Sequence, residues 1–262
     1  MQKWLDIAVS APAHSQVGGL LSYVTELPAA VGQLVRVPFG SREVLGVVWG
    51  IHTSPPALLS THTLRQVTAV LDGIEPLSAN WRQLVQFSAQ YYQRALGEVA
   101  MAALPPQLRD LTPVQMARRL KKQPASTESL AAALQSPWPL SSQQTEVLAQ
   151  MAAAPGPFLL HGATGSGKTE VYLQAVARCL ADNPKAQALM MVPEINLTPQ
   201  LEARVKARFG DEGVVSMHSG MTGPQRLKSW LAAHQGSARI VLGTRMAIFA
   251  SMPHLKWIVV DE

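Results

Sequence analysis

The segment HGATGSGKTE, residues 161–170, combines glycines, a lysine and a threonine at the spacing of a phosphate-binding loop. The glycines let the backbone adopt positive φ and approach a ligand without a Cβ in the way. Consecutive amides then form an anion site at the start of the following helix. Lys168 adds a positive charge for the β- and γ-phosphates, and the Thr169 hydroxyl is placed to coordinate Mg²⁺. The expected ATP-binding residues are Gly162, Ala163, Thr164, Gly165, Ser166, Gly167, Lys168 and Thr169.

A second chemical site is expected at residues 257–262, where a buried-strand pattern ends in two carboxylates. A phosphate-binding loop needs such a carboxylate at the end of a neighbouring strand to hold the magnesium shell. Asp261 is expected to bind Mg²⁺, directly or through water, and Glu262 to orient or deprotonate the attacking water. Two solvated carboxylates are the structural alternative, which the phosphate-binding loop disfavours. Because a natural domain rarely ends on a central strand, the sequence predicts that the chain is a fragment.

Residues 140–262 alternate short apolar runs with helical stretches, which is typical of a parallel sheet covered by helices on both faces. Thr198 before Pro199, and Thr222 before Pro224, predict two helix starts. The expected strands lie in PFLLHG, AQALMMVPE, GVVSMHSG, ARIVLGT and KWIVVDE. The fold class predicted for this half is therefore α/β.

Residues 1–110 have a different pattern, in which β-like runs lie between glycines and prolines. Strands are expected at 3–9, 20–24, 33–39, 44–50 and 66–71. The alternation in QLVRVPFG predicts a half-buried strand in a small antiparallel barrel or sandwich. A helix capped by Ser78 should follow, with an apolar face of Trp81, Leu84, Val85, Ser88 and Tyr92. Tyr91 and Tyr92 can stack on bases, although tyrosines at helical spacing more often belong to a core.

The composition excludes several classes of protein. The 22 basic and 17 acidic residues give a net charge of +5, a mild indication of a polyanionic partner. The one dense basic patch, residues 118–122, is either a solvated linker face or a DNA contact. A single cysteine excludes a disulfide framework and a multi-cysteine zinc cluster within the chain. Because no apolar run reaches membrane-spanning length and no signal peptide is apparent, a cytoplasmic protein without a membrane partner is expected.

Several segments resemble the primosomal replication-restart helicases of helicase superfamily 2. VPEINLTPQ, residues 192–200, is similar to the family motif that lies along single-stranded DNA, and GTRMAIF, residues 243–249, is similar to a later motif. LSSQQ, residues 140–144, resembles the segment that reads adenine, and the resemblance makes Gln144 the adenine-contacting residue. RVPFG, residues 36–40, resembles part of the family's N-terminal DNA-binding domain.

The resemblance implies three parts. Residues 1–110 would be a mainly-β DNA-binding domain of the 3′-end-binding type, and residues 111–139 a linker in place of a shortened or missing winged helix. Residues 140–262 would be a first RecA-like helicase lobe, with a P-loop parallel sheet, truncated at the Walker B carboxylates. Ser22 occupies the position of a family acidic residue, so the 3′-end pocket is expected to be altered or lost. The implied DNA-binding residues are Tyr23, Arg36, Thr198, Thr244 and Arg245.

The implied function is an ATP-dependent 3′→5′ DNA helicase that recognises stalled forks and helps to reassemble the primosome. Its expected partners are forked and single-stranded DNA, primosome proteins and single-stranded-DNA-binding protein, and zinc is expected only in the missing region after residue 262. Without a second lobe and its arginine finger, worth roughly 10³ to 10⁵ in rate, this chain should bind nucleotide weakly and unwind nothing. A P-loop kinase and a non-catalytic DNA- or primosome-binding paralogue or fragment are the alternatives.

Overall fold

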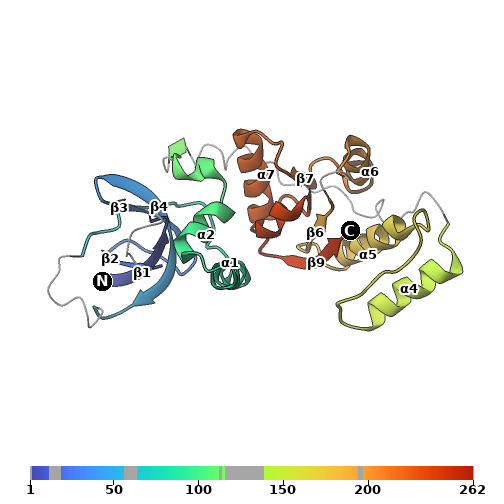
Figure 1. Ribbon diagram of the computed structural model, residues 1–262, viewed down its shortest axis with the longest axis horizontal. Coiled ribbons are helices and arrows are strands. Elements are labelled where there is room, and N and C mark those ends of the chain that lie inside the picture. The colour runs from blue at the N-terminus through green and yellow to red at the C-terminus, as the bar shows by residue number, and fades with distance from the viewer. Residues whose placement is uncertain are drawn as a thin grey trace. The chain divides into compact units, whose positions relative to one another are not determined.

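The computed structural model describes residues 2–11, 19–55, 64–111, 114–115, 139–193 and 197–261 (Figure 1). The chain divides into two compact units. The first contains Met1–Gln123, Gly220–Gln235 and Phe249–Pro253, and the second contains Pro124–Ser219, Gly236–Ile248 and His254–Glu262. The basic patch at 118–122 and the predicted catalytic Glu262 lie outside the described residues.

The first unit is built on five antiparallel strands in the order β2-β1-β4-β3-β5. They are β1 (Lys3–Val9), β2 (Leu21–Thr25), β3 (Leu34–Phe39), β4 (Arg42–His52) and β5 (Ala69–Val70). The Val24 amide donates to the Arg65 carbonyl at 3.1 Å, and the Val67 amide donates to the Val24 carbonyl at 3.0 Å. Because these bonds join β2 to the segment just before β5, the sheet closes into a small barrel. The predicted antiparallel β domain is confirmed.

The barrel is followed by α1 (Ala79–Tyr91), α2 (Leu96–Ala103) and the 3₁₀ helix η2 (Pro106–Arg109). Ser78 caps α1 as predicted, since its hydroxyl accepts a hydrogen bond from the Trp81 amide at 3.2 Å. Helix α2 approaches β1 so closely that a Cβ on Gly97 would lie 1.8 Å from the Val9 carbonyl oxygen. This contact requires glycine.

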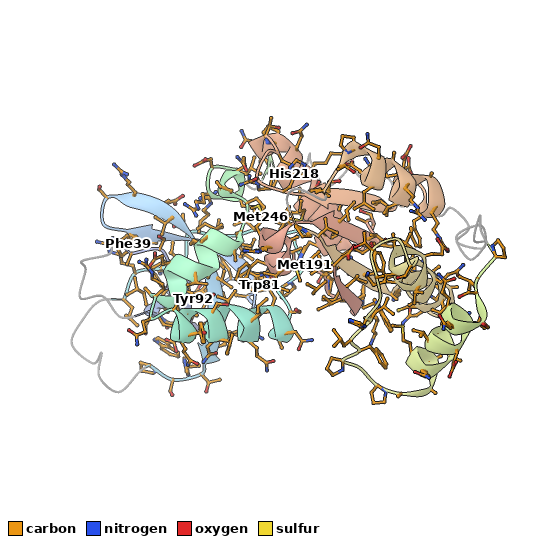
Figure 2. The ribbon with its side chains drawn as sticks, turned by 45° about the vertical axis from the view of Figure 1, so that its right-hand side comes forward. Phe39, Trp81, Tyr92, Met191, His218 and Met246 are labelled. Atoms are coloured by element: carbon orange, nitrogen blue, oxygen red, sulfur yellow. The ribbon has the colours of Figure 1, made fainter. Side chains whose placement is uncertain are left out.

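The apolar face predicted for α1 is correct at its start and wrong at its end. Trp81, Val85 and Ser88 are buried, whereas Tyr92 is 70% exposed and Tyr91 is 69% exposed (Figure 2). The reason is that α1 ends at Tyr91, so Tyr92 no longer follows the helical stripe that faces the core. The two rings contact each other edge to face, with centroids 5.0 Å apart.

The second unit contains a parallel four-stranded sheet in the order β7-β8-β6-β9. Its elements are α4 (Ser142–Ala153), α5 (Lys168–Asp182), β6 (Gln187–Met191), α6 (Pro199–Phe209), β7 (Val214–Met217), β8 (Ile240–Gly243) and β9 (Leu255–Val260), with the 3₁₀ helix η4 (Arg245–Phe249) after β8. Thr198 caps α6, and its hydroxyl accepts from the Leu201 amide at 3.3 Å. The predicted α/β fold class is therefore confirmed.

The strand predicted in PFLLHG is absent, because residues 157–163 have no regular structure. The Phe158 ring stacks on Trp257 with centroids 6.3 Å apart, and Leu160 packs beside the core around Leu148, but Leu159 is 93% exposed. An apolar run shows that side chains require burial but does not identify a strand that would pair with their backbone. Here Leu160 is only partly buried and Phe158 is 38% exposed, so the run is an apolar loop that packs on its neighbours.

Helix α7 (Gly223–Gln235) groups with the first unit. It begins directly after Thr222, whose carbonyl accepts from the Arg226 amide at 3.0 Å, as the sequence predicted. Leu227, Trp230 and Leu231 are all buried. None of the helices in the described part of the chain is both long and apolar enough to cross a membrane.

His234, near the end of α7, is buried and fully hydrogen-bonded. Its Nε2 lies 2.9 Å from the Glu75 carbonyl oxygen, and its Nδ1 lies 2.8 Å from the Ser251 hydroxyl. Because a carbonyl can only accept, Nε2 carries the proton and Nδ1 accepts from Ser251. Burial lowers the pKa of His234 to about 4, against a smaller opposing effect of the Glu75 hydrogen bond.

Acid is therefore expected to destabilise the first unit through His234. Between pH 6.5 and 4 the unfolded chain binds a proton that the folded chain excludes, so stability falls as the pH falls. The free energy of unfolding should be about 2 kcal/mol lower at pH 5 than at pH 7 from this group. Urea denaturation at both pH values measures the difference. His234→Gln should remove most of this pH dependence. His254→Gln is the control, because it replaces an exposed histidine, and it should keep the pH dependence of the wild type. The same pH dependence in the wild type and both variants would contradict the role of His234.

Candidate nucleotide-binding site and neighbouring DNA-binding residues

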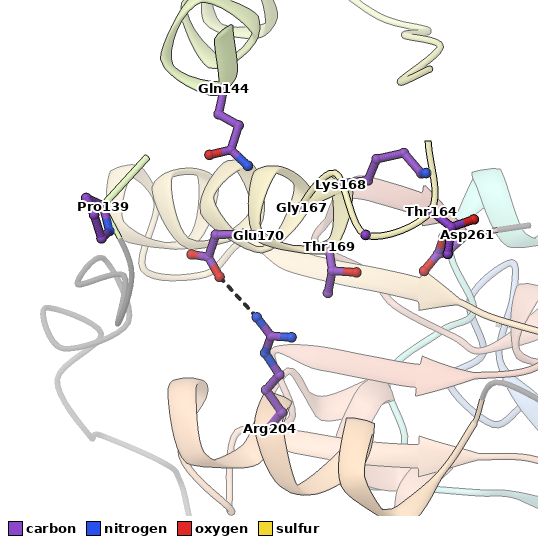
Figure 3. A pocket seen from close by; sticks show the side chains of 10 residues that line it. Pro139, Gln144, Thr164, Gly167, Lys168, Thr169, Glu170, Arg204 and Asp261 are labelled. Carbon is purple, nitrogen blue, oxygen red and sulfur yellow. Dashed lines mark hydrogen bonds and ion pairs between the residues drawn. The ribbon is translucent and has the colours of Figure 1, made fainter. Parts of the chain in front are cut away.

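A cavity of about 590 Å³ lies at the N-terminus of α5 (Figure 3). The predicted phosphate-binding loop, the predicted adenine residue and the predicted magnesium ligands all contribute to its wall. Its lining residues are Pro139, Gln144, Thr164, Gly165, Gly167, Lys168, Thr169, Glu170, Arg204 and Asp261. Residues as distant in the sequence as Pro139 and Asp261 therefore meet at one cavity.

The loop has the backbone that its glycines were expected to permit. Gly165 and Gly167 have φ values of 82° and 83°, and Gly167 is the N-cap of α5. The Lys168 ammonium donates to the carbonyl oxygens of Gly162 at 2.7 Å and Ala163 at 3.1 Å. The loop thus folds around its own lysine at the positive end of a helix, which is the arrangement that binds phosphate.

The magnesium side of the cavity contains Thr169 and Asp261, whose hydroxyl and carboxylate oxygens are ligands that Mg²⁺ prefers. One Asp261 carboxylate oxygen accepts a hydrogen bond from the Tyr172 hydroxyl at 2.9 Å. Burial, reinforced by the nearby Asp261 charge, raises the pKa of Tyr172 to about 12, against a smaller lowering effect of a Thr169 hydrogen bond. Tyr172 therefore stays a hydrogen-bond donor at neutral pH. These residues fit a Mg²⁺ ion whose other ligands are phosphates and water.

The sequence did not identify Tyr172 as part of this site. Its side chain lies on the buried face of α5. Its hydroxyl nevertheless reaches Asp261. The available signal was its position three residues after Thr169, which places the two side chains on one face of the helix.

Gln144 links α4 to the phosphate-binding loop. Its Oε1 accepts from the Ser141 amide at 2.9 Å, which completes a capping box at the start of α4. Its Nε2 donates to the Ser166 carbonyl at 3.4 Å. The φ of 83° at Gly167, which residues with a Cβ rarely adopt, favours glycine beside this side chain. The adenine-reading role of Gln144 remains a prediction, which its place in the cavity wall supports.

The second unit contains three residues predicted to bind DNA, and each comes after the carboxyl end of a strand of the parallel sheet, as Asp261 of the nucleotide site does. Thr198 follows β6, Thr244 and Arg245 follow β8, and Asp261 follows β9. Because these strands are parallel, their carboxyl ends meet at one edge, where open α/β sheets bind ligands. Arg245 is exposed, whereas Thr244 is 2% exposed. The DNA-binding roles of both residues remain predictions.

In the first unit, the side chains of Arg36 and Tyr23, both predicted to bind DNA, are buried and hydrogen-bonded within the fold. Arg36 is 9% exposed, and its guanidinium donates to the backbone carbonyls of Leu108, Arg109 and Leu111. The Tyr23 side chain is in the barrel core, and its hydroxyl donates to the Pro38 carbonyl at 3.0 Å. Both polar groups are used within the fold, because buried donors need acceptors. The structure thus gives both side chains a role within the fold, and their DNA-binding roles remain predictions.

A carboxylate lies beside Ser22 even though Ser22 itself is uncharged. The Ser22 hydroxyl donates to one Asp6 oxygen at 3.1 Å, and His52 Nε2 lies 2.7 Å from the other. Asp6 and Ser22 are paired across β1 and β2, so their side chains share one face of the sheet. An acidic side chain therefore lies on the neighbouring strand, in hydrogen-bond contact with Ser22.

A phosphate-binding loop and an aspartate at the edge of a parallel sheet define a P-loop nucleotide-binding lobe. Residues 141–262 match the DEAD/DEAH box helicase family, and residues 6–105 match the PriA 3′DNA-binding domain (3′BD). The two parts of the chain match these two domain families in order, so the resemblance to replication-restart helicases is confirmed. Helicase domains of this class use a nucleotide and Mg²⁺.

The individual relatives carry the same family name. The chain is 30% identical over 266 residues to replication restart protein PriA of Treponema pallidum, covering 100% of this chain and 38% of the relative. It is 48% identical over 105 residues to PriA of Bacillus subtilis, which is 40% of this chain and 13% of that protein. PriA of Haemophilus influenzae is 43% identical over 125 residues, or 47% of this chain and 17% of that protein. The chain spans well under half of the length of these relatives.

Proposed function

We propose that this chain is the DNA- and nucleotide-binding part of an ATP-dependent 3′→5′ DNA helicase that acts in replication restart. The observation that supports this most strongly is the cavity in which the phosphate-binding loop, Gln144 and Asp261 meet. Its wall combines a positive loop for phosphates with an amide suited to adenine. We assign it ATP.

The residues have separate tasks in this proposal. Lys168 leaves the loop carbonyls to neutralise the terminal phosphates, and Tyr172 holds the Asp261 carboxylate in place through its hydrogen bond. A bound Mg²⁺ would neutralise charge on the phosphates, and Thr169 and Asp261 would hold it. Glu262, which follows Asp261, is proposed to orient the attacking water.

DNA is proposed to bind along the edge that carries Thr198 and Arg245. Thr198 begins α6, and helix N-termini favour phosphate, while Arg245 presents a positive side chain. The first unit is proposed to bind a 3′ DNA end, with Asp6 as the acidic group near Ser22. Fork recognition, contacts with primosome proteins and single-stranded-DNA-binding protein, and a cytoplasmic location complete the proposal.

Unwinding assays test the proposal. The full-length protein should separate a forked duplex with 3′→5′ polarity and only when ATP and Mg²⁺ are present. The 262-residue chain should bind DNA and nucleotide without unwinding, because translocation needs two lobes that open and close. Robust unwinding by this chain would contradict the second statement. ATP-independent DNA binding by the full-length protein, without hydrolysis, would favour the non-catalytic paralogue.

A further inference from the structure

Three charged side chains meet between α5 and α6, next to the phosphate-binding loop. Glu170 lies between two arginines: Arg208 Nη1 is 2.7 Å from one carboxylate oxygen, and Arg204 Nη2 is 3.4 Å from the other. The side chains of Glu170 and Arg208 are each 8% exposed, whereas that of Arg204 is 49% exposed. One ion pair is therefore short and buried, and the other is long and open to solvent.

Only the open pair reaches the cavity. Glu170 and Arg204 line it, and Arg208 does not (Figure 3). Since Arg208 already balances the carboxylate, Arg204 adds a net positive charge to the wall. Thr169 and Asp261, the proposed magnesium ligands, line the same cavity as Arg204.

We propose that Arg204 is a further nucleotide-binding residue, whose guanidinium turns from Glu170 to contact the phosphate chain of a bound nucleoside triphosphate. This inference rests on the proposed ATP-binding function of the cavity. A half-exposed ion pair at 3.4 Å contributes little, so releasing it costs little. A guanidinium on phosphate gains charge-assisted and often paired hydrogen bonds. Thr198 caps α6, and Arg204 lies within it, so one helix carries both the proposed phosphate contact and a proposed DNA contact.

A purely structural ion pair between α5 and α6 is the competing explanation, and the two make different predictions. If the pair only joins the helices, removing either partner should change nucleotide affinity alike. If Arg204 contacts phosphate, Arg204→Gln should weaken binding of the Mg²⁺ complex of fluorescent methylanthraniloyl-ATP to the 262-residue chain by about tenfold. Glu170→Gln should instead tighten it, because a carboxylate is removed from the wall of an anion-binding cavity.

Matched variants keep the test decisive. Arg178→Gln changes an exposed arginine of α5 that does not line the cavity, and should bind as the wild type does. If Glu170→Gln does not fold, Arg204→Lys provides the second measurement, since a retained charge should recover part of the affinity. Lys168→Ala reports on the cavity itself. Loss of binding in Lys168→Ala with wild-type binding in Arg204→Gln would overturn this inference alone, whereas wild-type binding in Lys168→Ala would overturn the proposed function.

Discussion

Replacing Lys168 with alanine is expected to lower the rate of ATP hydrolysis by the full-length protein by about 10²- to 10³-fold, the usual effect of removing one preorganised electrostatic contact. The Lys168 ammonium is held inside the loop by the Gly162 and Ala163 carbonyls. In the proposed function it exchanges these contacts for the terminal phosphates, where charge accumulates during transfer. Steady-state hydrolysis with saturating single-stranded DNA measures the effect.

DNA affinity provides the internal control for this variant. It should stay within about twofold of the wild type in the absence of nucleotide, because the proposed DNA residues Thr198 and Arg245 do not depend on the lysine charge. Lys185→Ala removes an exposed lysine from the turn after α5 and should leave hydrolysis unchanged. Unchanged hydrolysis in Lys168→Ala would show that the loop is not the catalytic site.

The parts of this molecule that could be predicted from the sequence are those that depend on neighbouring residues. The loop around Lys168 is fixed by its own glycines, and the starts of α1 and α6 are fixed by Ser78 and Thr198. The strands of both sheets followed from the alternation or the length of apolar runs. In each case the cause of the structure lies within a few positions along the chain.

The predictions that failed depend on contacts between distant segments. Nothing near Tyr92 indicates that α1 ends one residue earlier, and nothing near Leu159 shows which strand would pair with its backbone. Tyr172 and Arg204 belong to the nucleotide cavity because α5 and α6 bring them there. Periodicity correctly assigns such residues to a buried or an exposed position but does not show which polar group they reach.

Arg36 lies on a strand that the local pattern predicted, but its side chain bonds to a distant segment. Its replacement is expected to have the largest effect on the free energy of unfolding. The alternation around it predicted a half-buried strand, and the resemblance of RVPFG to the family's DNA-binding domain implied a DNA contact. In the structure the guanidinium donates to three carbonyls that follow or end η2, those of Leu108, Arg109 and Leu111. Burial lowers the pKa of Arg36, with Glu43 and then Asp110 opposing the shift. Arg36 is therefore the residue that attaches this turn to the barrel.

Arg36→Met should lower the free energy of unfolding of the first unit by about 3 to 5 kcal/mol, because it removes the donor from three backbone carbonyls that are then left without partners. Urea denaturation followed by tryptophan fluorescence measures this. Arg65→Met removes an exposed guanidinium that donates to the Gly40 carbonyl at 2.8 Å, and should cost less than about 1 kcal/mol. If Arg36→Met unfolds like the wild type but loses DNA affinity, Arg36 is a DNA contact after all, and the attachment of η2 must come from other residues.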